Sequence, residues 1–189
     1  MFKAIYLRLV AFIFRPMDAW EALGRKRVKD SDDFLSHFFY PLIGLIALAA
    51  FAGMLFAGHE FDVVIALKSS IKAIAASAGG VFLASYLLNE LWGSWFKRER
   101  DMRLMQSFVG YASSLLFVLQ IILSFFPELI FLWIPALYTI YIVWAGAVNY
   151  LKVDGEVQMK FTGIASLIII GAPAAISFLL FMLMPGLRF

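Results

Sequence analysis

The chain has 189 residues, of which 63% are hydrophobic and only 15% charged, and its mean hydropathy is +0.88. Soluble domains carry about a quarter charged residues, and a soluble globule of this size could not hide so much apolar surface from water. Disorder is excluded as well, because disordered chains are poor in aromatic and aliphatic residues. The composition therefore identifies an integral membrane protein.

The charged residues point to a lipid surface. The net charge is +3 and the pI is about 9.2, but the bases lie in short segments between apolar blocks. We therefore expect them to face anionic lipid beside the helix ends, and we expect no nucleic-acid partner. The chain has no cysteine, which excludes disulfides, thiol catalysis and cysteine-ligated metals.

Residues 1–37 are predicted to form a cytoplasmic amphipathic arm. A cleaved signal peptide is the alternative, but Arg8 interrupts the apolar run, Arg15–Pro16 closes it, and no small-x-small cleavage site follows. Pro16 suits the first turn of a helix and Gly24 suits its end.

One or two helices of the arm are therefore expected to lie along the inner leaflet, with Trp20 at the depth of the lipid headgroups. Arg25 to Lys29 would follow as a basic loop, and Ser31-Asp32-Asp33 would cap the first span.

Residues 38–184 are predicted to form an all-α domain with five transmembrane helices. A helix needs about 20 apolar residues to cross the hydrocarbon core, and the continuous apolar runs show none of the alternation of a barrel strand. An even number of spans would require one stretch to be split or discarded. The five spans are 38–57, 71–95, 108–126, 129–151 and 161–184.

The distribution of Lys and Arg predicts the orientation, because cytoplasmic segments carry an excess of these residues. With the N-terminus inside and the C-terminus outside, thirteen bases fall on the cytoplasmic side and three on the other. The three are Lys68, Lys72 and Arg188. A multi-pass protein of the inner (cytoplasmic) membrane is the localisation that we expect.

Two connections also have predicted structures. The run Val63–Leu67 is expected to form a helical lead-in to the second span. Only Pro127-Glu128 joins the third and fourth spans, which predicts a tight antiparallel hairpin. We find no internal repeat, so the inverted-repeat architecture of transporters has no support.

Small residues at four-residue spacing mark two predicted spans. Such residues let helix backbones approach closely in lipid. One interpretation is that the two spans pack together within the chain, and the other is a homodimer interface. The two sets are Ala49, Gly53 and Ala57 in the first span and Ala76, Gly80 and Ala84 in the second.

Polar residues within spans are costly and often functional. Glu90 is the only acid well inside a span, roughly 10 Å from the cytoplasmic surface at 1.5 Å per residue. It could pair with Lys97, Arg98 or Arg103 as a structural contact, or it could belong to a proton, ion or headgroup site. The candidate polar pocket near the inner leaflet comprises Asn89, Glu90, Tyr111, Ser113 and Asn149.

No catalytic or cofactor motif is found. Aromatic residues make up 17% of the chain, and belts at the membrane interfaces account for most of them without a ligand. The two histidines, His37 and His59, are predicted on opposite sides of the membrane, and no zinc-ligand set or phosphate loop can be assembled. We expect a protein that is not an enzyme and has no cofactor or metal.

The architecture resembles the Yip family (Ypt/Rab-interacting proteins), in particular its bacterial branch. Pro16-x-x-x-Trp20 is similar to the Pro…Trp element at the start of bacterial members, and Phe108-Val109-Gly110-Tyr111-Ala112-Ser113-Ser114 resembles the family's Gly-Tyr signature. The Asp-Leu-Tyr-Gly-Pro motif of eukaryotic members is absent from residues 1–37, and Leu115-Leu116-Phe117 stands where a proline often follows Gly-Tyr. GTPase binding is therefore not carried over. The resemblance implies a non-enzymatic membrane protein linked to membrane organisation and trafficking.

Two functions remain open from the sequence. The first is a membrane scaffold or adaptor, with membrane lipids, another protein or a second copy of the chain as partners. The second is a small transporter, channel or lipid-handling protein built around Glu90. The residues expected to contact anionic lipid in the first case are Arg25, Lys26, Arg27, Lys97, Arg98 and Arg100.

Overall fold

The computed structural model describes residues 2–26, 34–56, 61–153 and 155–183, and this part of the chain is all-helical, with no strand. The predicted fold class is thereby confirmed. The helices in chain order are α1 (Phe2–Phe14), α2 (Pro16–Lys26), η1 (Leu35–Phe39), α3 (Tyr40–Gly53), α4 (Val63–Ser94), α5 (Met102–Ala112), α6 (Ser114–Phe125), η2 (Ile130–Trp133), η3 (Pro135–Tyr138), α7 (Thr139–Asn149) and α8 (Glu156–Leu183).

Four continuous helical stretches among the described residues are long and apolar enough to cross a membrane. A fifth span is obtained when α5 and α6, which meet at a 47° bend, are counted together. The four stretches are Leu35–Gly53, Val63–Ser94, Phe131–Asn149 and Glu156–Leu183.

The bend between α5 and α6 lies inside the span predicted as a single helix over 108–126. Ser113 leaves helical geometry (φ −77°, ψ 1°). Its hydroxyl donates to the Val109 carbonyl at 2.8 Å, and the Ser114 hydroxyl donates to the Tyr111 carbonyl at 2.7 Å. Serine side chains that bond back to the helix backbone commonly bend a helix, so two consecutive serines break this span.

The span predicted over 129–151 is also irregular. Its first part consists of the two short 3-10 turns η2 and η3, and α-helix begins only at Thr139. Pro135 has no N–H to donate to a preceding turn, so regular α-helix starts only after it.

The second and fifth spans are longer than predicted. α4 begins at Val63 because the Asp62 carboxylate accepts from the backbone N–H groups of Val64 (2.7 Å) and Ile65 (3.4 Å). The expected helical lead-in over Val63–Leu67 is thereby confirmed as helix. The expected cap at Ser31-Asp32-Asp33 lies outside the described residues.

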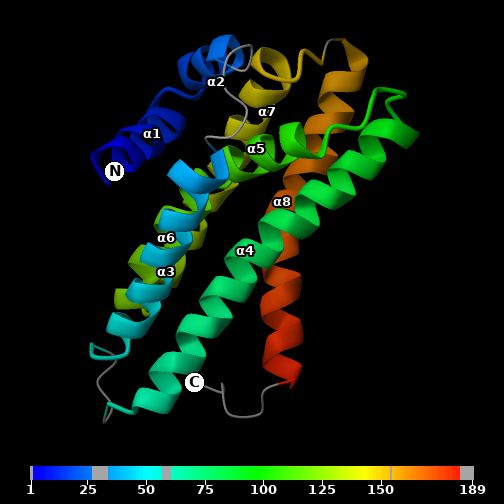
Figure 1. Cartoon of the computed structure of the whole chain (residues 1–189). Coiled ribbons are helices and arrows are strands. Elements are labelled where there is room, and N and C mark those ends of the chain that lie inside the picture. The colour runs from blue at the N-terminus through cyan, green and yellow to red at the C-terminus, as the bar shows by residue number, and fades with distance from the viewer. Residues whose placement is uncertain (1, 27–33, 57–60, 154, 184–189) are drawn as a thin grey trace.

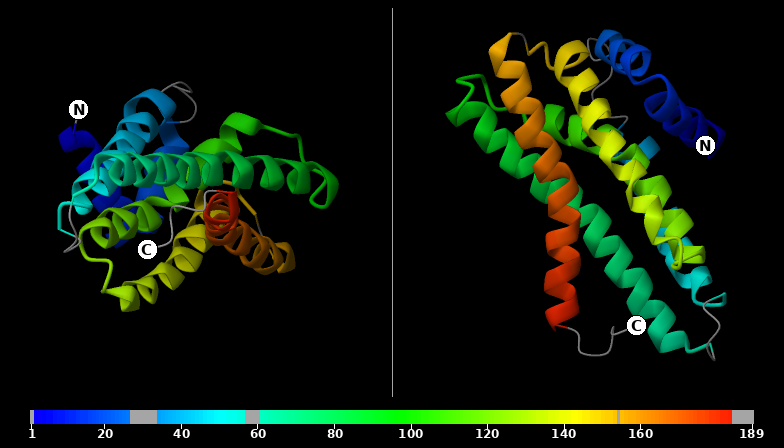
Figure 2. Two further views of the ribbon diagram at one scale, coloured as in Figure 1. Left: turned by 90° about the horizontal axis from the view of Figure 1, so that it is seen from below. Right: turned by 180° about the vertical axis from the view of Figure 1, so that it is seen from behind.

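Segments far apart in the sequence meet at one end of the molecule (Figures 1 and 2). Helix α2, the C-terminal ends of α4 and α7 and the N-terminal ends of α5 and α8 lie at this end. The C-terminal ends of α3 and α8 and the N-terminal end of α4 lie at the other. We call the first the basic end, because it gathers the described parts of the three segments predicted to be cytoplasmic.

The small residues of α3 and α4 are used for close packing inside the chain. The two helices lie against each other, and the Ser70 hydroxyl of α4 donates to the Ala47 carbonyl of α3 at 3.0 Å. The glycines, however, face other helices: a side chain at Gly53 would overlap the Ser124 carbonyl of α6, and one at Gly80 would lie 2.6 Å from Pro173 Cγ of α8.

The two helices pack together, but Gly53 and Gly80 each lie against a third helix, α6 and α8 respectively. Ala49, Ala76 and Ala84 are buried, and Ala57 lies outside the described residues.

Gly53→Ala should destabilise the fold by about 1–3 kcal/mol, the usual cost of overpacking, because the obstructing group is a backbone carbonyl. Gly44→Ala in the same helix is the matched control, since nothing lies within 4 Å of a side chain there and alanine is the better helix former by about 1 kcal/mol. Thermal unfolding in detergent should show a lower midpoint for Gly53→Ala only. Equal midpoints for the two variants would contradict the packing described here.

Candidate functional site

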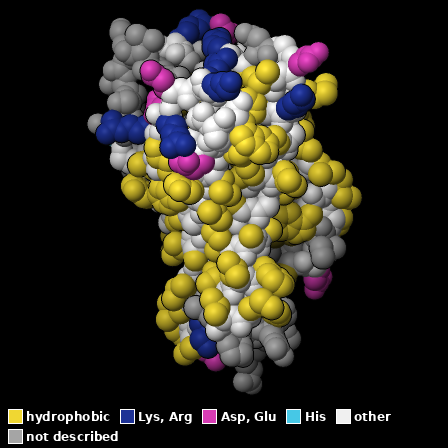
Figure 3. Space-filling view, turned by 90° about the vertical axis from the view of Figure 1, so that its right-hand side faces the viewer, with side chains coloured by type: hydrophobic (Ala, Val, Ile, Leu, Met, Phe, Trp, Pro, Cys, Tyr) yellow, Lys and Arg dark blue, Asp and Glu magenta, His cyan; other side chains and the backbone are white. Residues whose placement is uncertain are grey.

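Lys and Arg side chains gather at the basic end, whereas hydrophobic side chains cover the length of the face seen in Figure 3. The structure thus brings together bases from the N-terminal arm, the α4–α5 connection and the α7–α8 connection. The described bases of these segments are Lys3, Arg8, Arg15, Arg25, Lys97, Arg98, Arg100, Arg103, Lys152 and Lys160.

The C-terminal ends of α4 and α7 are built alike at this end. Each helix is followed by a lysine in the left-handed region, Lys97 (φ 51°) after α4 and Lys152 (φ 54°) after α7. The next backbone N–H then reaches back to the helix, from Arg98 to the Trp92 carbonyl (3.2 Å) and from Val153 to the Ala147 carbonyl (2.9 Å). Such a cap satisfies carbonyls that a helix end leaves free.

Arg98 ties the two helix ends together. Its guanidinium donates to the carbonyls of Leu151 (3.3 Å) and Lys152 (3.1 Å) and lies over the Trp92 ring, 5.1 Å from the ring centre. A cation beside the C-terminal carbonyls of a helix is stabilising, and the ring face adds a cation–π contact. Arg98 therefore has a structural role.

Glu90 pairs with Arg100, which was not among the three bases predicted as its partners. Arg100 Nη2 lies 2.9 Å from Glu90 Oε2, and the two side chains are 53% and 40% exposed. The pair forms because α4 ends at Ser94 and the chain turns back over the last helical turn, where Gly93 leaves room for the arginine stem. The carboxylate thus has a base beside it and is accessible at the surface.

These contacts bear on the prediction of lipid-binding residues. Lys97, Arg98 and Arg100 are all exposed, but Arg98 and Arg100 are also engaged with protein groups. Arg25 pairs with Glu21 at 2.9 Å in an exposed i, i+4 contact, which is weak in water. Arg27 and the Lys26 side chain lie outside what the structure describes.

The other residues of the predicted polar pocket bond to different neighbours. Tyr111 accepts a hydrogen bond from Arg8 (3.2 Å), Ser113 bonds within its own helix, and Asn149 donates to the Ala145 carbonyl (2.9 Å) and to Met17 Sδ (3.2 Å). Asn89 is buried, and its Oδ1 has no partner among the described residues. A common pocket for these residues stays a prediction.

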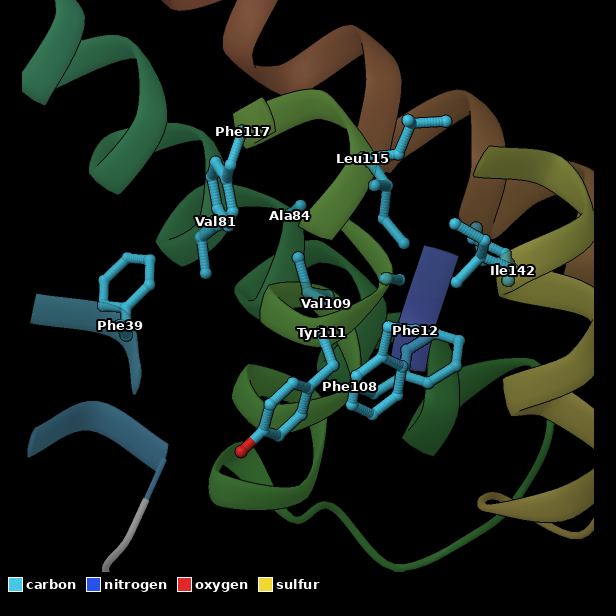
Figure 4. Close-up of a cluster of buried hydrophobic side chains, with 14 of the residues drawn as sticks. Phe12, Phe39, Val81, Ala84, Phe108, Val109, Tyr111, Leu115, Phe117 and Ile142 are labelled. Carbon is cyan, nitrogen blue, oxygen red and sulfur yellow. The ribbon is translucent and has the colours of Figure 1, made fainter. Parts of the chain in front are cut away.

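Three of the residues that carried the family resemblance, Trp20, Phe108 and Tyr111, meet in one buried aromatic cluster near the basic end. Trp20 is fully buried, and its ring lies 4.9 Å from Phe12, 5.4 Å from Phe108 and 6.4 Å from Tyr111. Tyr111 stacks on Phe12 at 4.6 Å. Figure 4 shows Phe12, Phe108 and Tyr111 in this cluster, near Ile142 of α7.

One hydrogen bond and two glycines hold the arm in place. The indole N–H of Trp20 donates to the Ile142 carbonyl at 2.9 Å. A side chain at Gly146 would lie 2.7 Å from the Trp20 ring, and one at Gly110 would overlap the Phe34 ring. Glycine is therefore required at both positions by the aromatic rings that lie over the backbone.

The expected depth of Trp20 among the lipid headgroups stays a prediction, but its ring is covered by protein and exposed to neither lipid nor water. Helix α2 packs against α7.

Three groups that make long-range contacts in the structure were not predicted from the sequence. Gly146 and Arg8 gave no local signal of their partners. Gln120 was a visible polar residue in the third span, and its side chain accepts from the Ser77 hydroxyl of α4 at 2.7 Å. Among the described residues, no group of three or more His, Asp or Glu side chains is placed to hold a metal ion.

Trp20→Ala should release the arm, because it removes a buried ring, at a cost of about 3–5 kcal/mol, and leaves the Ile142 carbonyl without its indole donor. The natural chain has no cysteine, so a Leu9→Cys background, at a position only 9% exposed, reports undocking of α1 through its rate of maleimide labelling. Labelling should be faster in Trp20→Ala than in Trp95→Ala, which removes a 66% exposed tryptophan. Equal rates would show that Trp20 does not hold the arm.

A family model described as the Yip1 domain matches residues 10–184. No curated protein and no solved structure matches the chain. The matched segment begins inside α1 and runs through α8, so it includes both the arm residue Trp20 and the Gly110–Tyr111 pair on which the arm docks. The chain therefore belongs to the Yip family of multi-pass membrane proteins, which are in general non-enzymatic.

Proposed function

We propose that the protein is a membrane scaffold or adaptor of the bacterial Yip branch, located in the inner (cytoplasmic) membrane with its N-terminus in the cytoplasm and its C-terminus outside. The observation that carries the proposal is the basic end, where three segments distant in sequence bring their Lys and Arg residues together. The positive-inside rule supports this orientation.

We assign two roles to the bases at the basic end. Arg8, Arg98 and Arg100 have protein partners and hold the arm and the connections in place. Lys97 and Lys152 are exposed beside them, on two adjacent helix ends linked by Arg98. These lysines and Arg25 would contact anionic headgroups, each contributing about 1 kcal/mol near a charged surface.

A partner would be recognised at the same end. The docked arm and the described parts of the α4–α5 and α7–α8 connections lie at this one end, where a peripheral protein or a second copy of the chain would bind. Docking of the arm favours such binding, because a preorganised surface loses less entropy on binding.

The triple variant Arg25→Glu/Lys97→Glu/Lys152→Glu should bind anionic lipid about a hundredfold more weakly, given about 1 kcal/mol for each of the three bases. The measurement is native mass spectrometry of the full chain in detergent, titrated with phosphatidylglycerol and, separately, with phosphatidylcholine. Binding of phosphatidylglycerol should also weaken at about 1 M salt, where the Debye length is about 3 Å.

Two control variants distinguish a loss of lipid contact from a loss of folding stability. Lys68→Glu reverses an exposed base at the opposite end and should leave the binding unchanged. Arg98→Glu should lower the unfolding midpoint, since it breaks the bonds to Leu151 and Lys152. If the triple variant binds phosphatidylglycerol as the natural chain does, the basic end is not a lipid-contact surface.

A small transporter, channel or lipid-handling protein is the second candidate function. The observation in its favour is Asn89, a buried amide with an unpartnered oxygen one residue from Glu90. The pairing of Glu90 with Arg100 weighs against it, because a paired surface carboxylate is not free to take up a passing ion.

If the second function holds, Glu90→Gln should abolish ion or proton flux in liposomes, whereas Glu99→Gln, an exposed acid of the same end, should not. The scaffold function predicts that Glu90→Gln leaves the flux at the level of the natural chain.

A further inference from the structure

Two exposed lysines at the basic end have an unusual backbone conformation. Lys97 after α4 (φ 51°) and Lys152 after α7 (φ 54°) are the non-glycine residues with a positive φ in the described part of the chain. Glycine is the usual residue at this place after a helix, because a Cβ is crowded in the left-handed region. Two helices of this chain therefore carry lysine where glycine would be less strained.

In the described part of the chain, no protein group binds the two ammonium groups. Both side chains are exposed, and neither Nζ has a hydrogen-bond or ion-pair partner among the described residues. The backbone bonds that close the two helix ends need only the left-handed backbone and not a lysine side chain. Residues held in strained backbone conformations gather at functional sites, so a ligand outside the chain explains these lysines better than the fold does.

Arg98 holds the two lysine backbones near each other. It follows Lys97 in the chain, and its guanidinium donates to the carbonyl of Lys152 at 3.1 Å and to that of Leu151 at 3.3 Å. One arginine side chain therefore spans the distance between the two backbones. The same contacts cover carbonyls at a helix end, whose partial negative charge would repel an anion. Two ammonium groups on flexible stems are thus anchored at neighbouring points.

The charges around the two lysines favour an anion as the ligand. The Glu90 carboxylate pairs with Arg100 at 2.9 Å, and the Asp101 carboxylate caps α5. Both acids are therefore engaged within the protein. Glu99 is exposed and adds one negative charge, against the positive charges of the two lysines and of Arg98.

Apolar side chains beside the lysines suit the rest of a lipid molecule. Trp95, which is 66% exposed, lies two residues before Lys97. Met159, which is 82% exposed, lies in the first turn of α8, after Lys152. Exposed tryptophan is typical of the membrane interface, where headgroups meet acyl chains. A free phosphate would use only the lysines, whereas a phospholipid uses both kinds of group.

We propose that Lys97 and Lys152 form a binding site for a phospholipid with two linked phosphates, of the cardiolipin type, in which each lysine contacts one phosphate. This inference rests on the proposed function, in which the basic end contacts anionic lipid, and it names the lipid. A phosphodiester carries one negative charge, so two phosphates are needed to neutralise two lysines. When one molecule carries both phosphates, the second contact forms at a high effective concentration.

Native mass spectrometry of the full chain in detergent tests the proposal, with cardiolipin and phosphatidylglycerol compared at equal phosphate concentration. The natural chain should bind cardiolipin at least about tenfold more tightly, because the second contact is intramolecular. Lys97→Gln and Lys152→Gln should each remove this preference, since one lysine cannot use both phosphates. The charge-keeping variant Lys97→Arg/Lys152→Arg should retain it. Lys160→Gln, which neutralises another exposed base of the same end, should retain it as well.

Unfolding midpoints distinguish a ligand site from a structural role of the lysines. Lys97→Gly and Lys152→Gly place glycine in the left-handed region, so without lipid each variant should unfold at the midpoint of the natural chain or above it. Cardiolipin should raise the midpoint of the natural chain, because a ligand that binds the folded state stabilises it, and should raise it less in the glycine variants. Lower midpoints without lipid would show that the lysines serve the fold, and would overturn the proposal.

Failure of this site differs from failure of lipid contact in general. The site is overturned if the natural chain binds cardiolipin no more tightly than phosphatidylglycerol, or if Lys160→Gln removes the preference as Lys97→Gln does. Displacement of cardiolipin by inorganic pyrophosphate at equal phosphate concentration would also overturn it, since the ligand would then be a free phosphate. The proposed function is tested separately, by the binding of phosphatidylglycerol to the natural chain and to the triple variant.

Discussion

Trp20 joins the N-terminal arm to the membrane-spanning helices, and the geometry of the basic end follows from this contact. The ring is buried among Phe12, Phe108 and Tyr111, and its N–H meets the Ile142 carbonyl at 2.9 Å. An indole combines a large apolar surface with one donor, so it is stable in such a place only where a carbonyl is within reach. Gly146 allows that approach because it has no side chain beneath the ring.

The same requirement, that polar groups in a membrane be satisfied by the protein, shapes the helix ends. The carbonyls that α4 and α7 leave free are met by backbone N–H groups after Lys97 and Lys152 and by the guanidinium of Arg98. At the same end Glu90 pairs with Arg100, although its side chain is 40% exposed. Basic residues that a count of charges assigns to the lipid surface therefore partly serve the structure of the protein itself.

Much of the fold could be predicted from the sequence. The apolar stretches indicate the order of the spans, and the run Val63–Leu67 extends the second span as expected. The bend at Ser113 and the 3-10 turns before Thr139 were not predicted, because apolar length alone says where a chain can cross a membrane and not whether it does so as one regular helix. The serine pair and Pro135 were visible, but their effect depends on hydrogen bonds that hydropathy does not describe.

Only part of the candidate site could be predicted from the sequence. Lys97 and Asn89 could be singled out as an exposed base and a buried polar residue, since composition and spacing set these properties locally. Three features could not be predicted: that Glu90 pairs with Arg100, that Gly53 and Gly80 each lie against a third helix, and that the Trp20 ring is covered by protein.

By itself, the sequence determined that the protein is an all-helical membrane protein of the Yip family with its bases in three separate segments. Only the tertiary structure decided that these segments share one end, that Trp20 meets Ile142, and which bases remain exposed. The physical reason is that periodicity and hydropathy act over one helix, whereas a contact between residues 20 and 142 depends on how separate helices pack.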